Sequence, residues 1–364
     1  MNFKSIKSNF SDILVNMPGW HTDRKIVVIE SDDWGSIRMP SKEVYDHLLK
    51  ADVRVDKCHY CKYDSLASED DLSALFEVLF SVKDKNNNPA IITANTIVAN
   101  PDFNKIRESN YQTYYYEPFI ETLKRYPHHA KSFELWKQGM ENHVWKPQFH
   151  GREHLNVKRW ISSLQNPSNA TRMAFDLNLF GLSTIIINEK KTFWVPFDSS
   201  GEEDNHLHQE IITEGLDLFK NIFNYTSLSF IAPNYNWYGD LEYHLFRLGV
   251  KYIQGLKRNL YKIRYIGQRN KSGMISLIRN SFFEPSESDI DIVDNCLNDI
   301  KRAFRMRKPA IISSHRVNFI GDIVKANRDK NLILLERLLK RVVKYWPNVE
   351  FMSSDQLGEL ISSK

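Results

Sequence analysis

Short runs of apolar, often β-branched residues alternate along the chain with longer amphipathic stretches, and this alternation limits the possible folds more than any other feature. A short apolar run predicts a buried strand, whereas apolar residues three or four positions apart predict a helix with one buried face. The expected strands are Lys25–Ser31, Ala90–Val98, Lys146–His150, Leu182–Asn188, Leu228–Pro233, Val250–Gln254, Ile275–Arg279, Ala310–Ser314 and Val349–Met352. The expected helices are Glu69–Lys83, Pro118–Tyr126, Lys131–Asn142, Leu241–Leu248, Asp289–Arg305 and Asn331–Trp346.

Strands that alternate with helices in this way indicate an α/β fold with a parallel sheet, either open or closed into a barrel. We favour a barrel-like (β/α) arrangement with irregularities. Two local signals support the expected boundaries. Ser68 stands where a helix N-cap is expected, and Gly249 stands where a helix ends. In such folds the reactive side chains follow the carboxyl ends of the strands.

The composition excludes several classes of protein. The chain has 364 residues, and its 49 basic and 45 acidic residues give a net charge of only +4, which does not suggest a nucleic-acid binder. No apolar run is long enough to span a membrane, and the N-terminal stretch lacks the apolar core of a signal peptide. The three cysteines suit a reducing compartment, so we expect a cytoplasmic protein.

The cysteines suggest no complete site of their own. Cys58 and Cys61 have the spacing of a zinc knuckle, but the sequence has no second pair to complete a tetrahedral site. We interpret them as an incidental pair in a loop, with redox chemistry or metal binding as the alternative. Cys296 falls on the apolar face of an expected helix.

Ionisable or turn-forming residues follow four of the expected strands. They are Asp32-Asp33, His150 with His154, Asn234-Tyr235 and His315. His150 and His154 are four positions apart, so on a helical turn both imidazoles would project from one face. Two imidazoles and one carboxylate form a common ligand set for catalytic zinc. His206 and His208 lie in a polar stretch, where we expect them to be exposed to solvent.

The adjacent carboxylates of Asp32 and Asp33 need an explanation, because like charges repel. A bound divalent cation would be the largest local charge and would reverse that penalty. One aspartate could bind the metal while its neighbour faces the water that the metal activates. In the alternative interpretation, both residues cap a helix that begins near Ser36.

These motifs resemble those of the polysaccharide deacetylases of carbohydrate esterase family 4. The family's Thr-Phe-Asp-Asp-Gly corresponds to Glu30-Ser31-Asp32-Asp33-Trp34-Gly35, and its His-Ser/Thr-x-x-His corresponds to His150-Gly151-Arg152-Glu153-His154. The family's last motif places a histidine after an apolar strand, where this chain has His315. The three motifs occur in the family's order.

The resemblance implies a distorted (β/α) barrel and metal-dependent removal of N- or O-acetyl groups from sugars. By analogy Asp33, His150 and His154 would hold the metal, most often Zn²⁺, with Asp32 as general base and His315 as general acid. We expect residues 1–364 to form a single domain of this type, with insertions roughly in 36–130 and 160–225.

The chain also departs from the family pattern. The family's third motif commonly reads Arg-Pro-Pro-Tyr-Gly. The corresponding stretch here, Phe230-Ile231-Ala232-Pro233-Asn234-Tyr235, lacks the arginine that normally orients the base. Arg152 or Arg279 could replace it. A backbone N–H, with Asn234 as the candidate, would stabilise the oxyanion. Tyr235 and the inserted Trp34 could stack on sugar faces, although aromatic residues near strand ends also fill cores.

The expected substrate is an acetylated saccharide or a glycan precursor. Two alternatives stay open: a hydrolase of another non-peptide C–N or acyl bond, and a non-catalytic descendant that binds glycans. The sequence does not decide which sugar is bound, whether the acetyl group is on nitrogen or oxygen, which metal is used, or the oligomeric state.

Overall fold

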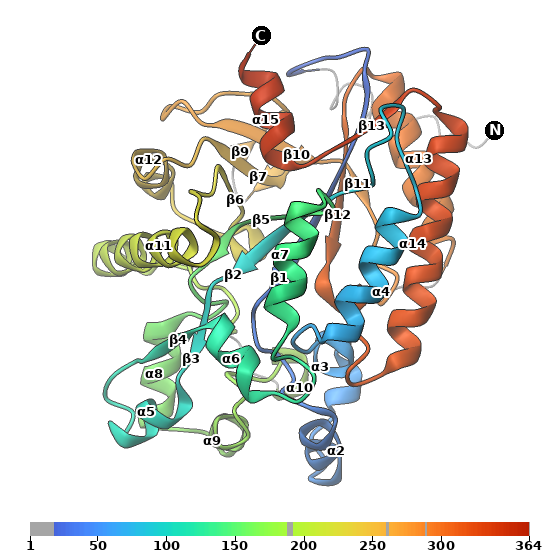
Figure 1. Cartoon of the computed structure of the whole chain (residues 1–364). Helices are drawn as coiled ribbons and strands as arrows, with labels where there is room; N and C mark the ends of the chain where they lie inside the picture. The colour runs from blue at the N-terminus through green and yellow to red at the C-terminus, as the bar shows by residue number, and fades with distance from the viewer. Residues whose placement is uncertain (1–17, 188–191, 260–261, 288–289, 364) are drawn as a thin grey trace, which may run out of the picture.

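The computed structural model describes residues 18–187, 192–259, 262–287 and 290–363, and its central feature is one parallel sheet. The strands follow one another in the order β10 (Ile275–Arg279), β7 (Tyr252–Leu256), β6 (Ser229–Phe230), β5 (Trp145–Gly151), β2 (Ile92–Ile97), β1 (Lys25–Trp34), β12 (Ala310–His315) and β11 (Ser281–Phe282), and β13 (Val349–Met352) also pairs with β1. Only Asn280 separates β10 from β11, so one run of chain leaves β7 and joins β12. The sheet is thus a nearly closed barrel, and the expected distorted (β/α) barrel is confirmed (Figure 1).

Helices surround the barrel (Figure 1), with α4, α13 and α14 on one flank and α11 and α12 on the opposite flank. The α-helices are α2 (Lys42–Lys50), α3 (His59–Tyr63), α4 (Glu69–Phe80), α5 (Phe103–Glu108), α6 (Phe119–Arg125), α7 (Ser132–Glu141), α8 (Val157–Gln165), α9 (Asn169–Asp176), α10 (Thr184–Ile187), α11 (Glu202–Phe223), α12 (Asp240–Arg247), α13 (Ile292–Arg305), α14 (Lys325–Tyr345) and α15 (Ser354–Ser362). Short 3₁₀ helices are η1 (Val55–Lys57), η2 (Pro233–Tyr235) and η3 (Arg316–Phe319), and two small antiparallel ribbons pair β3 (Ala99–Pro101) with β4 (Tyr116–Pro118) and β8 (Arg258–Asn259) with β9 (Lys262–Ile263). Within the described residues, no helix is both long enough and apolar enough to cross a membrane.

Alternate residues of β1 face two different hydrophobic clusters, as the period of a strand requires. Val27 and Ile29 pack outward in the large cluster that includes the surrounding helices. Ile26 and Val28 pack inward with apolar residues of β7, β10 and β12 and with Leu357 of α15. The inward cluster involves the first residues of these strands, so α15 closes the amino end of the barrel.

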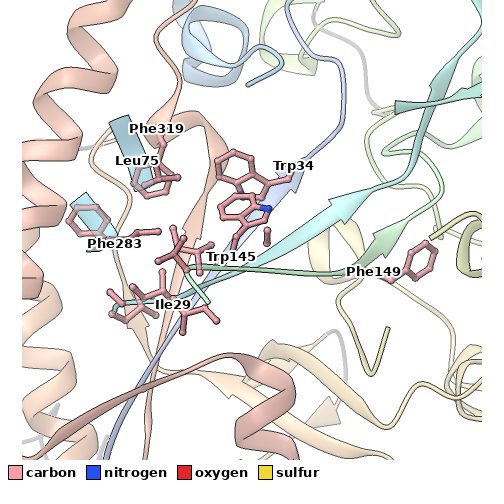
Figure 2. Packing of buried hydrophobic residues seen from close by; sticks show 14 of the residues in the cluster. Ile29, Trp34, Leu75, Trp145, Phe149, Phe283 and Phe319 are labelled. Carbon is pink, nitrogen blue, oxygen red and sulfur yellow. The ribbon is translucent and has the colours of Figure 1, made fainter. Parts of the chain in front are cut away.

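Aromatic side chains pack in the large cluster on the outer face of β1. Trp34 and Trp145 meet edge to face with ring centroids 4.4 Å apart, and Trp136 packs against both (Figure 2). Trp34 is 1% exposed, and its indole N–H donates to Ser31 Oγ at 2.9 Å. The expectation that Trp34 stacks on a sugar is therefore wrong, because the ring fills the core between β1 and β5.

Most of the expected elements agree with the structure. Ile275–Arg279 and Val349–Met352 have the bounds expected, Ser68 caps α4 through a reciprocal capping box, and Gly249 has a φ of +96° after α12. Cys296 is fully buried on α13.

Three expectations of local structure are wrong. The apolar run expected as a strand over Leu182–Asn188 forms the short helix α10 instead, and Asn188 lies outside the described residues. The polar stretch around His206 is part of the long helix α11; His206 is exposed as expected, but His208 is buried. Cys58 and Cys61 are not in a loop either: Cys58 caps α3, Cys61 lies within it, and both are buried.

Candidate active site

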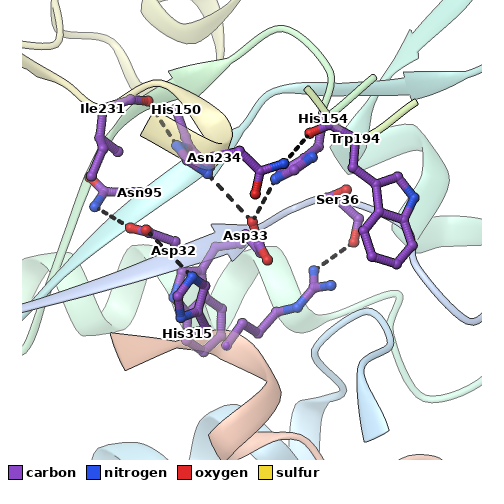
Figure 3. Close-up of polar contacts among 12 residues, drawn as sticks. Asp32, Asp33, Ser36, Asn95, His150, His154, Trp194, Ile231, Asn234 and His315 are labelled. Carbon is purple, nitrogen blue, oxygen red and sulfur yellow. Dashed lines mark hydrogen bonds and ion pairs between the residues drawn. The ribbon is translucent and has the colours of Figure 1, made fainter. Parts of the chain in front are cut away.

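An irregularity in β1 brings two adjacent carboxylates to the same side of the strand. In a regular strand the side chains of neighbours point to opposite faces. Here the pairing of β1 with β2 shifts register between Ser31 and Trp34, and Asp33 adopts a left-handed φ of 73°. A bulge of this kind re-aims a side chain, and Figure 3 shows Asp32 and Asp33 both directed into the site.

Gly35 makes this turn sterically feasible. Its φ is +83°, and a Cβ atom there would lie 2.3 Å from the carbonyl oxygen of Ile97. The chain from Gly35 to Pro40 is not helical, and the next helix, α2, is capped by Ser41. The alternative that Asp32 and Asp33 cap a helix near Ser36 is therefore excluded.

Asp33, His150 and His154 converge in a buried cluster with the donor set of a metal site (Figure 3). Asp33 Oδ1 lies 3.4 Å from His150 Nε2 and 3.2 Å from His154 Nε2. Their spacing had suggested that the two histidines share a helical turn, but they do not. His150 is the second-last residue of β5, the chain turns at Gly151 with a φ of +147°, and His154 follows in an irregular segment.

The protonation of these three side chains fits a cation. His150 Nδ1 donates to the carbonyl oxygen of Ile231 at 2.8 Å, which directs Nε2 toward Asp33. Burial and the nearby Arg38 lower the pKa of His154 to about 4, so its imidazole is neutral. Burial opposes ionisation of Asp33, but Arg38 and the histidines outweigh it and hold its pKa well below the usual value. Three lone-pair donors thus face one point, which a divalent metal would stabilise.

Asp32 lies beside this cluster and is held by Arg279. The guanidinium donates to Asp32 Oδ1 at 2.6 Å and to Oδ2 at 2.7 Å, and Asn95 Nδ2 donates to Oδ1 at 2.7 Å. Burial raises the pKa of Asp32, but Arg279 and the nearby histidines outweigh burial and lower it to about 2. Arg279 also donates to Glu30 at 2.7 Å and to the Tyr235 hydroxyl at 2.9 Å.

Of the two arginines considered as partners for the base, Arg279 is the one that contacts Asp32. Arg152 does not, although it lies within the histidine motif. Its guanidinium donates to Glu153 at 2.6 and 2.9 Å and also pairs with Glu214. The expectation that Arg152 contacts substrate or oxyanion has no support in these contacts, because its guanidinium is paired with Glu153 and with Glu214 of α11.

His315 completes the group from the end of β12. Its Nε2 lies 3.8 Å from Asp32 Oδ2, and its Nδ1 donates to Glu284 Oε1 at 2.7 Å. Burial opposes protonation, but Glu284 and Asp32 outweigh it, so the pKa of His315 is raised well above its usual value. Glu284 was not predicted from the sequence, although it follows the apolar pair Phe282-Phe283, which is the position that the strand-end rule singles out.

The segment after β6 lies at the rim of the site. Asn234 has a left-handed φ of 55°, and its side chain donates to the carbonyl oxygen of Trp194 at 2.9 Å. Tyr235 reaches the site through its hydroxyl bond to Arg279. Figure 3 shows Asn234 and Trp194 next to the histidines, so an indole from the irregular segment between α10 and α11 also borders the site.

Polar side chains inside the barrel support the site from below and were also missed by the sequence analysis. Asn95 bridges Asp32 to Gln254 with bonds of 2.7 and 2.8 Å, and Gln254 donates to Ser229 Oγ at 2.8 Å. They could have been found in the sequence as polar residues that recur at every second position of otherwise apolar strands. Such residues point inward with the site residues.

Comparison with solved structures bears on this architecture. A candidate glycoside hydrolase/deacetylase of Parabacteroides distasonis superposes with a TM-score of 0.53 at 8% identity, covering 96% of this chain and 73% of that protein. The barrel has the deacetylase fold. At this identity the likeness concerns the fold alone.

Two further structures align with most of the chain. A candidate polysaccharide deacetylase of Pseudomonas aeruginosa gives a TM-score of 0.49 at 8% identity, covering 93% of this chain and 91% of that one. A candidate polysaccharide deacetylase of Mycobacterium smegmatis gives 0.43 at 10% identity, covering 96% and 94%. The sequence matches no protein-family model and no curated protein. What the deacetylase fold does in this chain must therefore be argued from the site.

Proposed function

We propose that this protein is a metal-dependent hydrolase that removes N- or O-acetyl groups from a saccharide or glycan precursor in the cytoplasm. The observation that carries the proposal is one site in which three buried side chains with the donor set of a metal site lie beside a carboxylate and an imidazole that each have a charged partner of their own. Asp32 is paired with Arg279, and His315 is paired with Glu284. A set that is complete in this way favours catalysis over the alternative of a non-catalytic glycan binder.

Asp33, His150 and His154 would hold the metal, and Zn²⁺ suits one carboxylate and two imidazoles. When bound, the metal would lower the pKa of a water molecule and polarise the acyl carbonyl. Asp32 is suited to receive the proton of that water, because Arg279 fixes its orientation and keeps it ionised.

His315 is suited to protonate the leaving amine or alkoxide of the sugar. Glu284 occupies its Nδ1 and favours the imidazolium, which leaves the Nε2 proton directed toward Asp32 and the site. In this scheme Asp32 would receive a proton from the water, and His315 would give one to the leaving group of the sugar. The backbone N–H of Asn234 is our candidate for a hydrogen bond to the oxyanion, and Tyr235 is our candidate for a contact to the sugar.

The test combines metal analysis of the purified protein with acetate release from N- and O-acetylated saccharides. We expect about one equivalent of metal in the wild type and in Asp32→Asn, whose acetate release should fall by roughly 10²–10⁴-fold. Asp33→Asn should lose both metal and activity. Asp84→Asn is a matched control, since Asp84 is a buried aspartate that bonds to a loop and to the backbone of Phe351.

Asp84→Asn should keep its metal and its activity even if it is less stable. Equal acetate release from the wild type and Asp32→Asn would remove the proposed base. Release of another acyl group, but not acetate, would favour the hydrolase of another acyl or C–N bond.

A further inference from the structure

Three buried arginines lie around the site, and they differ in how their N–H groups are used. Arg279 donates to Glu30, Asp32, Tyr235 and Ser313. Arg316 donates to both oxygens of Asp64 at 2.9 and 3.0 Å and to the carbonyl oxygen of Ser36. In Arg38, by contrast, Nε and Nη1 have no hydrogen-bond partner among the residues that the structure describes.

The contacts that Arg38 does make are long. Its Nη2 lies 3.3 Å from Asp33 Oδ2, and its Nε lies 3.9 Å from Asp64 Oδ2. Asp64 is already paired with Arg316 at shorter distances, so charge balance at Asp64 does not require Arg38. Arg38 is only 5% exposed, and a buried cation with unused donors costs folding free energy. A ligand that accepts these hydrogen bonds would remove that cost.

The surroundings of Arg38 also point to an anion. Its guanidinium lies 4.6 Å from the ring centroid of Trp194 and 5.5 Å from that of Tyr60. The indole N–H of Trp194 is a third buried donor without a described partner. Two side chains in contact thus offer three unused donors, and donors alone are complemented by a group that only accepts, such as a carboxylate or a phosphate.

Arg38 and Trp194 lie next to the side chains to which we assign the chemistry. Asp33 faces the histidines through Oδ1 and Arg38 through Oδ2, and the Tyr60 ring lies 5.7 Å from that of His315. Tyr60 and Trp194 are half-buried, so a ligand would reach Arg38 by displacing their rings. A group bound at Arg38 would therefore belong to the same sugar as the acyl group, or to its immediate neighbour.

We propose that Arg38, together with Trp194, binds an acidic group of the substrate, so that the preferred substrate is an acylated saccharide carrying a carboxylate or phosphate close to the acyl group. This inference rests on the proposed function for the acyl group, but the binding of an anion by Arg38 and Trp194 does not. Arg38 acts here as a specificity residue, because its donors select the substrate without transferring a proton.

The test compares matched substrates with the metal-loaded wild type, Arg38→Met and Arg38→Lys. A neutral N-acetylglucosamine oligosaccharide is compared with N-acetylglucosamine linked to glucuronate and with N-acetylglucosamine 6-phosphate. We expect the wild type to favour at least one acidic substrate in kcat/KM by about tenfold or more. The ratio should fall to about one in Arg38→Met and lie between in Arg38→Lys, which keeps the charge but loses the planar fork. Whichever acidic substrate is favoured identifies the group as carboxylate or phosphate.

Calorimetric titration with glucuronate, glucose 6-phosphate and glucose gives a second readout that needs no turnover. Wild type should bind an acidic sugar more tightly than glucose, and Arg38→Met should not. Arg328→Met is the matched control, because Arg328 is a buried arginine of α14 that pairs with Asp71 of α4 and with Asp329. It should retain the wild-type preference.

The outcomes separate the two proposals. A preference for acidic sugars in binding without any acyl release would contradict the proposed function and leave the Arg38 inference standing. Equal losses with neutral and acidic substrates in Arg38→Met, or no preference in the wild type by either readout, would overturn the Arg38 inference. Arg38→Lys provides the test if Arg38→Met does not fold.

Discussion

The two ends of the barrel interior are built from the same strands but from opposite chemistry. At the amino end Ile26, Val28 and Ile311 pack with Leu357 of α15 into an apolar plug. Farther along β1 the inward positions are Glu30 and Asp32, which are almost fully buried and ionisable. Moving two residues along one strand thus exchanges a hydrophobic contact for a charge.

The amino end of the barrel therefore contributes mainly to stability, whereas the carboxyl end holds the residues of the proposed function. Apolar burial at the amino end stabilises the fold by roughly 25 cal/mol per Å² of buried surface. At the carboxyl end, burial of charges is costly, and pairing with Arg279 offsets that cost for Glu30 and Asp32. The buried charges at the carboxyl end are therefore not explained by stability, and they are the residues to which we assign the proposed chemistry.

Of the variants that test this comparison between the two ends, Arg279→Met should have the largest effect. It removes the positive charge that pairs with both Glu30 and Asp32. Acetate release should fall by roughly 10²–10⁴-fold, since Asp32 loses its orientation. The free energy of unfolding should fall by about 3–5 kcal/mol, because two buried carboxylates lose their partner. Urea denaturation and acetate assays measure the two effects.

Arg152→Met is the control for this variant, because Arg152 is also buried and paired with carboxylates but was assigned no contact with Asp32. It should be less stable than the wild type with activity within a few-fold. If Arg152→Met and Arg279→Met lose activity equally, then Arg279 is not the residue that positions the base.

Leu357→Ala tests the other end of the barrel. The side chain is fully buried in the plug, so its truncation should lower the free energy of unfolding by about 2–5 kcal/mol. Metal content and the pH dependence of acetate release should stay as in the wild type. A loss of metal from the folded variant would show that the two ends are coupled, and would contradict the separation described above.

The sequence was sufficient to predict the barrel and the residues that meet at its carboxyl end. The reason is physical: apolar runs mark strands wherever both faces are buried, and parallel strands bring their ends to one edge. Residue type and position at strand ends predicted that the two carboxylates and the histidines lie at one edge, the family resemblance implied the set Asp33, His150 and His154, and the structure brings these three together. The basis for pairing the histidines was nevertheless wrong, because the turn at Gly151, rather than a helix, brings His154 back.

The partners of the site residues could not be predicted in the same way. Arg279 and Asp32 are far apart in the chain, and nothing local distinguishes Arg279 from Arg152 as a partner for the base. Likewise, the helix α11 was missed because its polar face dominates the local sequence, while the burial of His208 depends on packing against distant elements. Pairing across the barrel is a property of the closed sheet, and short-range patterns do not encode it.

The smallest effect is expected for Glu284→Gln, which leaves the charge on Asp32 and Arg279 intact and changes only the partner of His315. Glu284 helps to raise the pKa of His315, so the wild-type imidazole stays protonated beyond the usual range of histidine. Activity that requires this proton should therefore decline only on the alkaline side. In Glu284→Gln the pKa of His315 should fall, and the alkaline limb of the kcat profile should move toward neutral pH.

The pH dependence of the free energy of unfolding gives an independent test of the same pKa change. A raised pKa in the folded state contributes stability that is fully present below the unfolded pKa and is lost as pH rises through the folded pKa. The wild type should therefore exceed Glu284→Gln in stability most at acidic to neutral pH, and the gap should close at alkaline pH. Glu336→Gln, which alters a half-buried glutamate paired with Lys340 on α14, should shift neither profile. An unchanged alkaline limb in Glu284→Gln would mean that the proton lost there does not belong to His315, and the carboxyl end of the barrel would then need a different general acid.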